Sequence, residues 1–409
     1  MTDVETAPAA AVDVLSRAGR RRVLAVLCLT QISSWGILYY AFPVLSVSIT
    51  GETGWSAPVI TAAFSLGQLA TALTGIPVGA LIDRTGPRKV MTAGSVVGAA
   101  ALAAIATAPN LVVFYLGWLA AGMAMGAVLY PPAFAALTRW WGAERVTALM
   151  ILTLAGGLAS TAFAPLTAAL DAHTDWRATY LVLAVVLAVL TVPVHWFGLQ
   201  AVWPEPPPPT EAAHADHSKI ARSPRFAALV VIMCLAAFAS FAGIFNLVAL
   251  LQEQGFSPGL AATALGLGGA GQVLGRIGYL PLARYTGVTA RTVLVLAALA
   301  ASTALLGLVS AVIALIAVAI GAGLVRGIFT LIQATAITDR WGATHYGRLN
   351  GLLSAPVVIV SALAPWAGTV LSAWTGSYAH TYLILGAVAA LAAVIAPFTG
   401  FTVSKKEML

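Results

Sequence analysis

Runs of predominantly apolar residues, each long enough to cross a bilayer as a helix of about 20 residues, recur along this chain from Val23 to Phe401. In hydrocarbon a segment must pair its own backbone N–H and C=O groups, so such runs are typical of membrane-spanning helices. Hydrophobic residues make up 60% of the 409 residues and charged residues only 9%, whereas soluble domains contain about 25% charged residues. The sequence therefore predicts an all-α integral membrane protein.

Twelve spanning helices are predicted in two groups of six, divided by a proline-rich polar stretch between Pro204 and Arg225. We expect a cytoplasmic tail at residues 1–22, a six-helix bundle at 23–200, a cytoplasmic linker at 201–225 whose proline-rich stretch from Pro204 is too irregular to pack, a second bundle at 226–401 and a cytoplasmic tail at 402–409. The helices are expected at about residues 23–49, 56–82, 90–108, 111–138, 146–170, 178–200, 226–251, 258–283, 292–309, 312–338, 349–373 and 378–401.

The two groups of six are copies of one unit. Gly54-Trp55-Ser56 and Gly255-Phe256-Ser257 stand 201 residues apart (255 − 54), and the same offset relates Gly122 and Gly126 to Gly323 and Gly327. Matches in step over a whole half indicate duplication of a six-helix unit in the same orientation. Parallel repeats of this kind place a substrate site between the halves, near the middle of the membrane. The paired glycines predict close helix packing.

The Lys and Arg residues predict which side of the membrane each loop faces. Of the 21, 18 fall in loops and tails on one side, Arg177 falls on the other side, and Arg276 and Arg326 lie within helices. Because basic loops stay in the cytoplasm, we expect a multi-pass protein of the plasma (inner) membrane with both termini cytoplasmic. This bias explains the net charge of +7, which therefore indicates no nucleic-acid partner.

Residues for enzymatic chemistry are not evident in the sequence. No nucleophile with a base, no paired carboxylates and no cluster of His and Cys is recognisable, and Cys28 and Cys234 stand alone inside apolar runs. We expect both cysteines to be small buried side chains, and we expect no metal and no cofactor. All fourteen Asp and Glu map to loops, tails or helix ends. The sequence therefore argues against an enzyme.

Arg276 and Arg326 are the residues most at odds with a membrane interior. An arginine at the centre of a spanning helix costs about 2.5 kcal/mol or more, and it nearly always faces the bundle interior or an aqueous cavity. A buried guanidinium needs a counter-charge, and no mid-helix acid is available to supply one. The sequence therefore favours an anionic substrate as the partner of at least one arginine, over an arginine tied only to helix carbonyls.

Further polar and aromatic side chains share helix faces with these arginines or lie in other predicted helices. Gln272 stands four residues before Arg276, and Gln333 stands seven residues after Arg326, so each pair lies on one face. Taken singly, such residues are more often hydrogen-bond partners between helices than ligands. Together we expect them to line one substrate cavity, formed by Arg276, Arg326, Gln272, Gln31, Trp35, Tyr39, Tyr130, Asn246 and Gln333.

The stretch between the second and third predicted helices resembles the signature loop of the major facilitator superfamily. Every position of that pattern is met, in the order Gly79-x-Leu81-x-Asp83-Arg84-x-Gly86-Pro87-Arg88-Lys89. In the second copy only Thr286-Gly287 persists, and Arg284 stands in place of the acid. The resemblance covers the whole chain. It implies twelve helices in two six-helix bundles, a central cavity between them, and transport by alternating access.

A narrower resemblance is to the monocarboxylate and oxalate/formate transporters, through Ser34-Trp35-Gly36, Tyr39-Tyr40 and an arginine on the eighth helix. It implies that Arg276 binds the substrate carboxylate. Several members have an acid four residues before this arginine that takes part in proton coupling, and some have a lysine on the first helix. Here the acid is replaced by Gln272 and the lysine is absent. Coupling is therefore left open between anion exchange and entry of a proton together with the carboxylate.

We expect the signature stretch to act as a gate through Gly79, Asp83, Arg84, Gly86 and Arg88. The glycines are expected to let the loop turn tightly. Asp83 is expected to accept hydrogen bonds from the N-terminus of a neighbouring helix or to pair with a nearby arginine. The positive-inside rule alone would account for the basic residues but not for Asp83 or the glycines.

The sequence therefore predicts a secondary active transporter of a small organic anion, a mono- or dicarboxylate. Its partners would be that anion, the lipid bilayer and either a proton or a counter-anion, and we expect a monomer. Two alternatives stay open. A proton-coupled drug efflux pump of the same fold would usually carry an acid in its cavity, and a non-transporting receptor or scaffold would need an added soluble domain.

Overall fold

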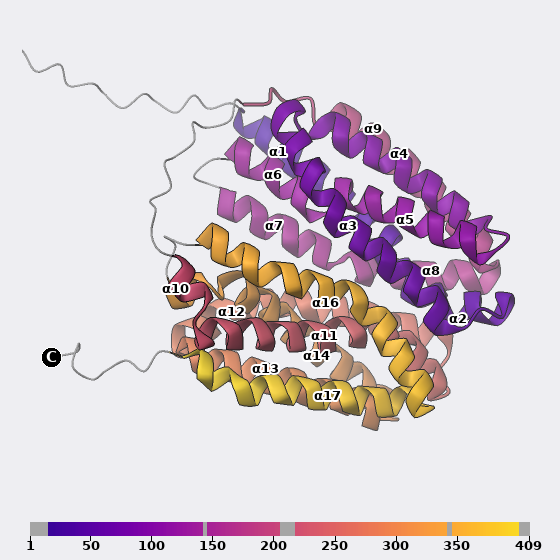
Figure 1. Ribbon diagram of the computed structural model, residues 1–409. Helices are drawn as coiled ribbons and strands as arrows, with labels where there is room; N and C mark the ends of the chain where they lie inside the picture. Colours follow the sequence, from indigo (N-terminus) through magenta and orange to yellow (C-terminus); the bar gives the residue numbers. More distant parts are fainter. Residues whose placement is uncertain (1–14, 142–144, 205–216, 342–345, 401–409) are drawn as a thin grey trace, which may run out of the picture.

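The computed structural model describes residues 15–141, 145–204, 217–341 and 346–400, and within these ranges the chain forms helices and no strands. The helices form two bundles that lie side by side, with the indigo-to-magenta first half above the rose-to-yellow second half in Figure 1. The predicted two-bundle helical architecture is therefore confirmed. Residues 1–14 and 401–409, and the part of the linker at 205–216, lie outside the described residues.

The first bundle contains the six predicted helices, three of them interrupted. Its elements are α1 (Arg17–Trp35), the π-helical turn η1 (Gly36–Tyr40), α2 (Ala41–Thr53), α3 (Ala57–Thr85), α4 (Pro87–Ala106), α5 (Leu111–Val128), α6 (Tyr130–Trp141), α7 (Arg145–Gly157), α8 (Ala159–His173) and α9 (Trp176–Gly198).

The second bundle follows a short helix in the linker. Its elements are α10 (His217–Ala221), α11 (Pro224–Glu253), α12 (Pro258–Tyr285), α13 (Val288–Leu308), α14 (Val312–Thr335), α15 (Thr338–Trp341), α16 (Tyr346–Thr375), α17 (Tyr378–Ile395) and the 3₁₀ turn η3 (Ala396–Thr399).

Eleven segments in the described ranges are long and apolar enough to cross a membrane. The predicted eighth span, α12, is not among them, although its 28 residues exceed the length needed. Its sequence contains seven glycines together with Gln272 and Arg276, which make it less apolar than its neighbours. The residues that lower its hydropathy are therefore those that let it pack closely and carry charge.

Three predicted helices of the first bundle are not continuous. The first is interrupted by the π turn η1 between α1 and α2, and it begins at Arg17 rather than Val23, where Ser16 caps it by accepting a hydrogen bond from the Gly19 amide at 3.1 Å. The fourth breaks at Leu129, since Pro131 and Pro132 supply no N–H group to continue the ladder. The fifth breaks at Leu158, directly after two glycines, which are weak helix formers.

The start of the predicted linker packs on the first bundle, ahead of the proline-rich stretch that begins at Pro204. The Trp203 indole N–H donates to the carbonyl oxygen of Asp83 at 3.2 Å, and Trp140 donates to that of Val202 at 3.0 Å. The two indole rings lie 5.4 Å apart. Aromatic burial therefore anchors this segment despite the prolines that follow it.

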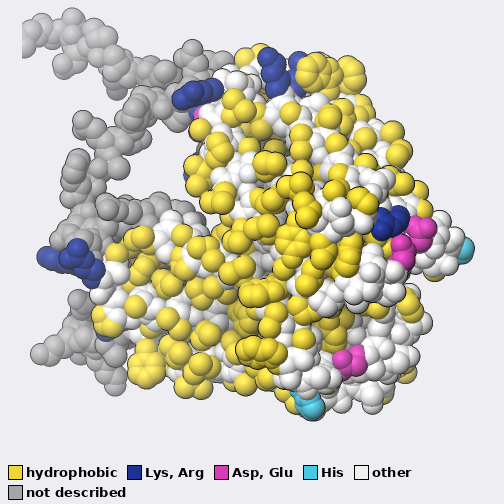
Figure 2. Space-filling view, turned by 45° about the vertical axis from the view of Figure 1, so that its right-hand side comes forward, with side chains coloured by type: hydrophobic (Ala, Val, Ile, Leu, Met, Phe, Trp, Pro, Cys, Tyr) yellow, Lys and Arg dark blue, Asp and Glu magenta, His cyan; other side chains and the backbone are white. Residues whose placement is uncertain are grey.

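Charged side chains are sorted along the helix axes. Figure 2 shows one face whose middle is covered by hydrophobic side chains, with most Lys and Arg at one end and Asp, Glu and His at the other. We call the first the basic end, where α3 ends at Thr85 and α12 ends at Tyr285, and the second the far end, where α2 ends at Thr53 and α11 ends at Glu253. Cys28 and Cys234 are free and half-buried.

The two bundles are joined near the far end. The hydroxyl oxygens of Thr61 on α3 and Thr369 on α16 lie 2.6 Å apart, and Thr161 on α8 donates to the Gly266 carbonyl on α12 at 2.8 Å. The Phe245 ring of α11 contacts Tyr39 at 4.8 Å and Phe64 at 4.7 Å between ring centroids. These contacts join the two bundles between the cavity described below and the far end.

Candidate functional site

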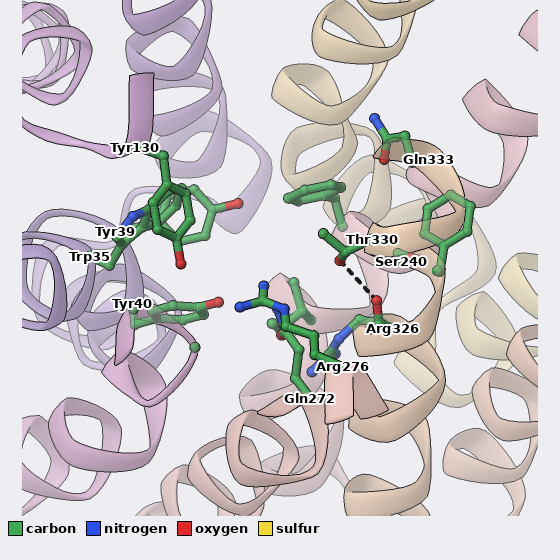
Figure 3. A pocket seen from close by; sticks show the side chains of 15 residues that line it. Trp35, Tyr39, Tyr40, Tyr130, Ser240, Gln272, Arg276, Arg326, Thr330 and Gln333 are labelled. Atoms are coloured by element: carbon green, nitrogen blue, oxygen red, sulfur yellow. Dashed lines mark hydrogen bonds between the residues drawn. The ribbon is translucent and has the colours of Figure 1, made fainter. Parts of the chain in front are cut away.

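A central cavity of about 230 Å³ lies between the two bundles, and residues of both line it (Figure 3). The first bundle contributes mainly aromatic rings, and the second contributes two arginines and most of the polar side chains. The lining residues are Trp35, Tyr39, Tyr40, Tyr130, Gly156, Gly157, Ser240, Phe241, Ile244, Gln272, Arg276, Arg326, Phe329, Thr330 and Gln333.

The wall from the first bundle is a connected set of rings. Trp35 lies 5.0 Å from both Tyr39 and Tyr130 between ring centroids, and Tyr39 lies 5.2 Å from Tyr40. Tyr39 and Tyr40 belong to η1, where the π turn lowers the angle between successive residues, so that both neighbours reach the cavity. We call Trp35, Tyr39, Tyr40 and Tyr130 the aromatic wall.

The wall from the second bundle is built on two closely packed helices, α12 and α14. A Cβ atom at Gly323 or Gly327 of α14 would overlap the carbonyl oxygen of Gly268 or Gln272 on α12. Glycine is therefore required for this approach, as the sequence predicted. The close packing brings Arg276 of α12 and Arg326 of α14 into one cavity despite their like charge.

Arg276 reaches across the interface. Its Nη1 donates to the carbonyl oxygen of Thr153 on α7, and Gly157 leaves it room, since a Cβ there would lie 3.2 Å from that nitrogen. The guanidinium points toward the Tyr40 hydroxyl in Figure 3. The Nε atom of Arg276 is buried and has no hydrogen-bond partner. Arg276 is thus held at the interface by the Thr153 carbonyl, while its Nε makes no hydrogen bond.

Arg326 is less satisfied than Arg276. Its Nε is buried without a hydrogen-bond partner, and the one bond made by this residue to the lining, from the Thr330 hydroxyl at 2.9 Å, goes to its backbone carbonyl. Within the described ranges, neither arginine forms a salt bridge with an acid. The cavity also has no Asp, Glu or His among its lining residues. Two guanidiniums therefore face it without a negative partner from the described chain.

Seven of the nine predicted cavity residues line it, and two do not. Gln31 is fully buried one turn before Trp35, where its Nε2 donates to the Val128 carbonyl at 2.6 Å. Asn246 donates to the Ala242 carbonyl at 2.9 Å and lines a separate cavity of about 520 Å³ nearer the far end. The prediction that they share the central cavity is wrong, because helical spacing fixes the face of a residue but not its depth.

Residues that the sequence interpretation did not propose also line the cavity. They include Tyr40, Ser240 and Phe241, and the Ser240 hydroxyl is buried without a hydrogen-bond partner. The internal repeat held a signal for them, because the offset of 201 maps Tyr39 and Tyr40 onto Ser240 and Phe241. Equivalent positions of the two halves thus face each other across the same space.

The signature stretch is a helix end, a one-residue turn and a helix start. Gly86 has a φ of 78° between α3 and α4, a conformation that favours glycine, and the Trp203 side chain packs against it. Gly79 lies inside α3 with open space where a Cβ would be, so the expectation that it helps the loop turn is wrong.

Charged residues of this stretch contact the ends of other helices. An Asp83 carboxylate oxygen lies 3.8 Å from Arg139 Nη1 of α6, which matches the expected pairing with a nearby arginine. Arg88 donates from Nε to the Trp196 carbonyl on α9 at 2.7 Å and stacks over that ring at 4.2 Å. Arg84 is exposed. Asp83, Gly86, Arg139 and Trp203 form one cluster at the basic end, here called the turn cluster.

A sequence profile of the Major Facilitator Superfamily matches residues 27–288, which is more than half of the chain. The chain belongs to the major facilitator superfamily. This confirms the family expected from the signature stretch, and with it a membrane transporter rather than an enzyme.

Individual proteins of the superfamily are similar over different lengths. Monocarboxylate transporter 13 of Rattus norvegicus is 26% identical over 370 residues, 87% of this chain and 81% of that protein. The uncharacterized MFS-type transporter YcxA of Bacillus subtilis is 29% identical over 147 residues, so the match spans only 35% of either protein. Multidrug resistance protein MdtH of Klebsiella pneumoniae is 32% identical over 99 residues, 24% of each chain.

Solved structures share the superfamily fold. A bacterial homolog of the human lysosomal transporter Spinster, in an inward-facing and occupied conformation, matches with a TM-score of 0.73. The match covers 94% of this chain and 97% of that one at 14% identity. Such a match supports the fold of both bundles.

Proposed function

We propose that this protein is a secondary active transporter that moves a small organic anion, a mono- or dicarboxylate, by alternating access of the central cavity. The observation that carries the proposal is the pair Arg276 and Arg326, two guanidiniums in a cavity between the halves with no acid among its lining residues. Charge-assisted hydrogen bonds from guanidinium to carboxylate are the interaction that this arrangement lacks. A carboxylate would supply both the counter-charge and the missing acceptors.

Arg276 is proposed to bind the carboxylate. It already bridges the two halves through the Thr153 carbonyl, and its buried Nε has no hydrogen-bond partner. A carboxylate that replaced or shared this bond would change the contact between the bundles at the moment of binding. Arg326 would supply the second positive contact, and Gln272 and Gln333 would orient the substrate through their amides.

The lining also bears on coupling and orientation. Since the cavity has no carboxyl or imidazole side chain among its lining residues, we propose that a proton enters with the carboxylate or that a second anion is exchanged for it. The basic end would face the cytoplasm of a plasma membrane, with both termini on that side, because Lys and Arg gather there.

The cavity volume weighs against the efflux of drugs. Sites for drug-sized ligands measure roughly 300–1,000 Å³, whereas this cavity measures about 230 Å³. It also offers no acid to hold a cation. Multidrug resistance protein MdtH matches only 24% of the chain, so this relative gives the alternative little support.

Uptake into proteoliposomes tests the proposal. We expect labelled small carboxylates to enter in a saturable way, and Arg276→Ala to lower apparent affinity about 10- to 150-fold, since a hydrogen bond to a charged group contributes about 1.5–3 kcal/mol. The apparent affinity of Arg276→Lys should lie between those of the wild type and Arg276→Ala, because lysine keeps the charge but not the planar guanidinium. The assignment would be contradicted if the wild type transported no carboxylate. It would also be contradicted if Arg276→Ala transported carboxylates as well as the wild type. Export of a cationic dye by the same liposomes would support the efflux alternative.

A further inference from the structure

We propose that the substrate is an aromatic monocarboxylate, a single ring bearing one carboxylate, with benzoate as its simplest form. The inference rests on the proposed function and concerns the part of the substrate that does not touch the arginines. It follows from how the cavity separates its charge from its rings.

The positive charge of the cavity lies on one side only. Arg276 and Arg326 come from α12 and α14, as do the amides of Gln272 and Gln333. The first bundle offers no Lys or Arg to the lining, and its wall is made of the rings of Trp35, Tyr39, Tyr40 and Tyr130 with Gly156 and Gly157. A substrate that satisfies both walls has its anionic end against the second bundle and an uncharged body against the first.

The aromatic wall is built to accept another ring. Trp35 meets Tyr39 edge to face with 71° between their planes, and it is tilted by 46° to Tyr130. The wall therefore presents both faces and edges, and aromatic rings prefer edge-to-face or offset partners at about 4.5–7 Å. Phe241 and Phe329 line the cavity from the second bundle. A flat ring would thus meet aromatic side chains of both halves.

Volume limits the body to one ring. An engineered apolar cavity of about 150 Å³ binds benzene, and the central cavity measures about 230 Å³. The additional volume accommodates a carboxylate and at most a short linker between the carboxylate and the ring. A two-carbon or three-carbon acid would leave most of the space beside the rings to water.

The test compares carboxylates of equal charge on purified protein and in proteoliposomes. Benzoate and phenylacetate are expected to bind at least tenfold more tightly than acetate, propionate or succinate. Cyclohexanecarboxylate, similar in size but not flat, is expected to bind several-fold less tightly than benzoate. If acetate, succinate or cyclohexanecarboxylate binds as tightly as benzoate, the inference is wrong while the proposed function stands. If no carboxylate binds, the proposed function itself fails.

Two variants locate the effect on the aromatic wall. Trp35→Leu and Tyr130→Leu are expected to lower the ratio of benzoate to acetate affinity at least fivefold, whereas Arg276→Ala should weaken both ligands together. Trp55→Leu is the matched control, since Trp55 packs on Phe114 at 5.3 Å and does not line the cavity. It should leave the ratio unchanged. A ratio that is equal in wild type, Trp35→Leu and Tyr130→Leu would overturn the inference, and the milder Trp35→Phe replaces Trp35→Leu if the latter does not fold.

Discussion

The two halves of this transporter share a framework at the level of single atoms. In the second half, Gly323 and Gly327 of α14 abut the carbonyl oxygens of Gly268 and Gln272 of α12. In the first half, Gly122 and Gly126 of α5 abut those of Gly67 and Thr71 of α3. Each of these four residues lies 201 positions before its counterpart (323 − 122). The duplicated unit has thus kept one helix contact in both copies.

The same halves differ in what they present to the central cavity. The positions equivalent to Arg276 and Arg326 in the first half are Gly75 and Met125, and Met125 is fully buried in an apolar core. The first half instead supplies the aromatic wall. The comparison teaches that packing was retained while the chemistry of each copy diverged. The site needs both copies, because neither half holds both the rings and the guanidiniums.

Breaking the shared framework should have the largest effect. Gly323→Ala places a Cβ against the Gly268 carbonyl, a backbone atom that cannot turn aside, so α12 and α14 must separate. Overpacking typically costs about 1–3 kcal/mol, and a clash with backbone lies at the upper end. We expect a melting temperature several degrees lower and less monodisperse protein in size-exclusion chromatography. Gly122→Ala should do the same in the first half.

Gly321→Ala is the matched control for this prediction. Gly321 lies in the same helix, and nothing stands within 4 Å of where its Cβ would be. Replacing a helical glycine by alanine at an unhindered position gains about 0.5–1 kcal/mol. The control should therefore be neutral or slightly more stable. Equal destabilisation by Gly323→Ala and Gly321→Ala would show that α14 tolerates neither substitution. The contact of Gly323 with α12 would then not explain the loss of stability.

The difference between the halves is tested next, by removing a charge that has no partner. Arg326→Met keeps a long apolar side chain but removes a guanidinium whose Nε is unsatisfied. Replacing buried charge by apolar groups is often neutral or stabilising, so the empty protein should melt at the same or a higher temperature. The apparent affinity for the most tightly bound carboxylate, measured from its stabilisation of the protein, should fall at least tenfold.

Arg291→Met shows what loss of a paired arginine looks like. Arg291 is buried and contacts an Asp339 carboxylate oxygen at 2.7 Å, so its removal strands that acid. The melting temperature should fall, with little change in carboxylate affinity. If Arg326→Met behaved like Arg291→Met, then Arg326 would be a structural residue and the second positive contact would be lost from the proposal.

The overall fold could be predicted because its signals are local. The long apolar runs, the repeat at an offset of 201 and the paired glycines can be read from the order of residues alone. The helices and the contacts between them agree with all three. Interruptions were harder to predict. The π turn at Gly36–Tyr40 lies just before Pro43, which has no N–H for the Tyr39 carbonyl, but a proline does not by itself distinguish a π turn from a kink or a break. A Cβ at Gly36 would also overlap Phe163, which is distant in sequence. A tertiary contact of this kind leaves no local signal.

Site residues could be predicted where a charge in an apolar helix marked them. They were harder to predict where their depth along the helix decided whether they reach the cavity. Arg276 and Arg326 stand out in any apolar helix, but Gln31 and Asn246 were placed by face alone and lie above or below the cavity. Trp203 was missed for a different reason. A tryptophan at the edge of a proline-rich linker gives no sign that it packs on Gly86 and donates to the Asp83 carbonyl.

The smallest effect is expected at the basic end, where the halves again differ. The first half has the pair Asp83 and Arg139, separated by 3.8 Å with 66% of the Asp83 side chain exposed, whereas the second has the tighter pair Asp339 and Arg291. At the position equivalent to Asp83 the second half has Arg284. Only the first half can therefore use this acid as a gate.

Asp83→Asn removes the charge but keeps the backbone carbonyl that Arg139 and Trp203 contact. An exposed ion pair contributes about 0.2–1 kcal/mol, so the balance between conformations should shift by no more than about fivefold. We expect the transport rate to fall by a factor in that range while equilibrium affinity for the carboxylate stays within twofold. Glu52→Gln, which breaks the exposed pair with Arg177 at the far end, is the matched control and should leave the rate unchanged. A large loss of affinity in Asp83→Asn with a normal rate would contradict a gating role, because it would mean that the turn cluster shapes the binding site rather than the movement between the two conformations.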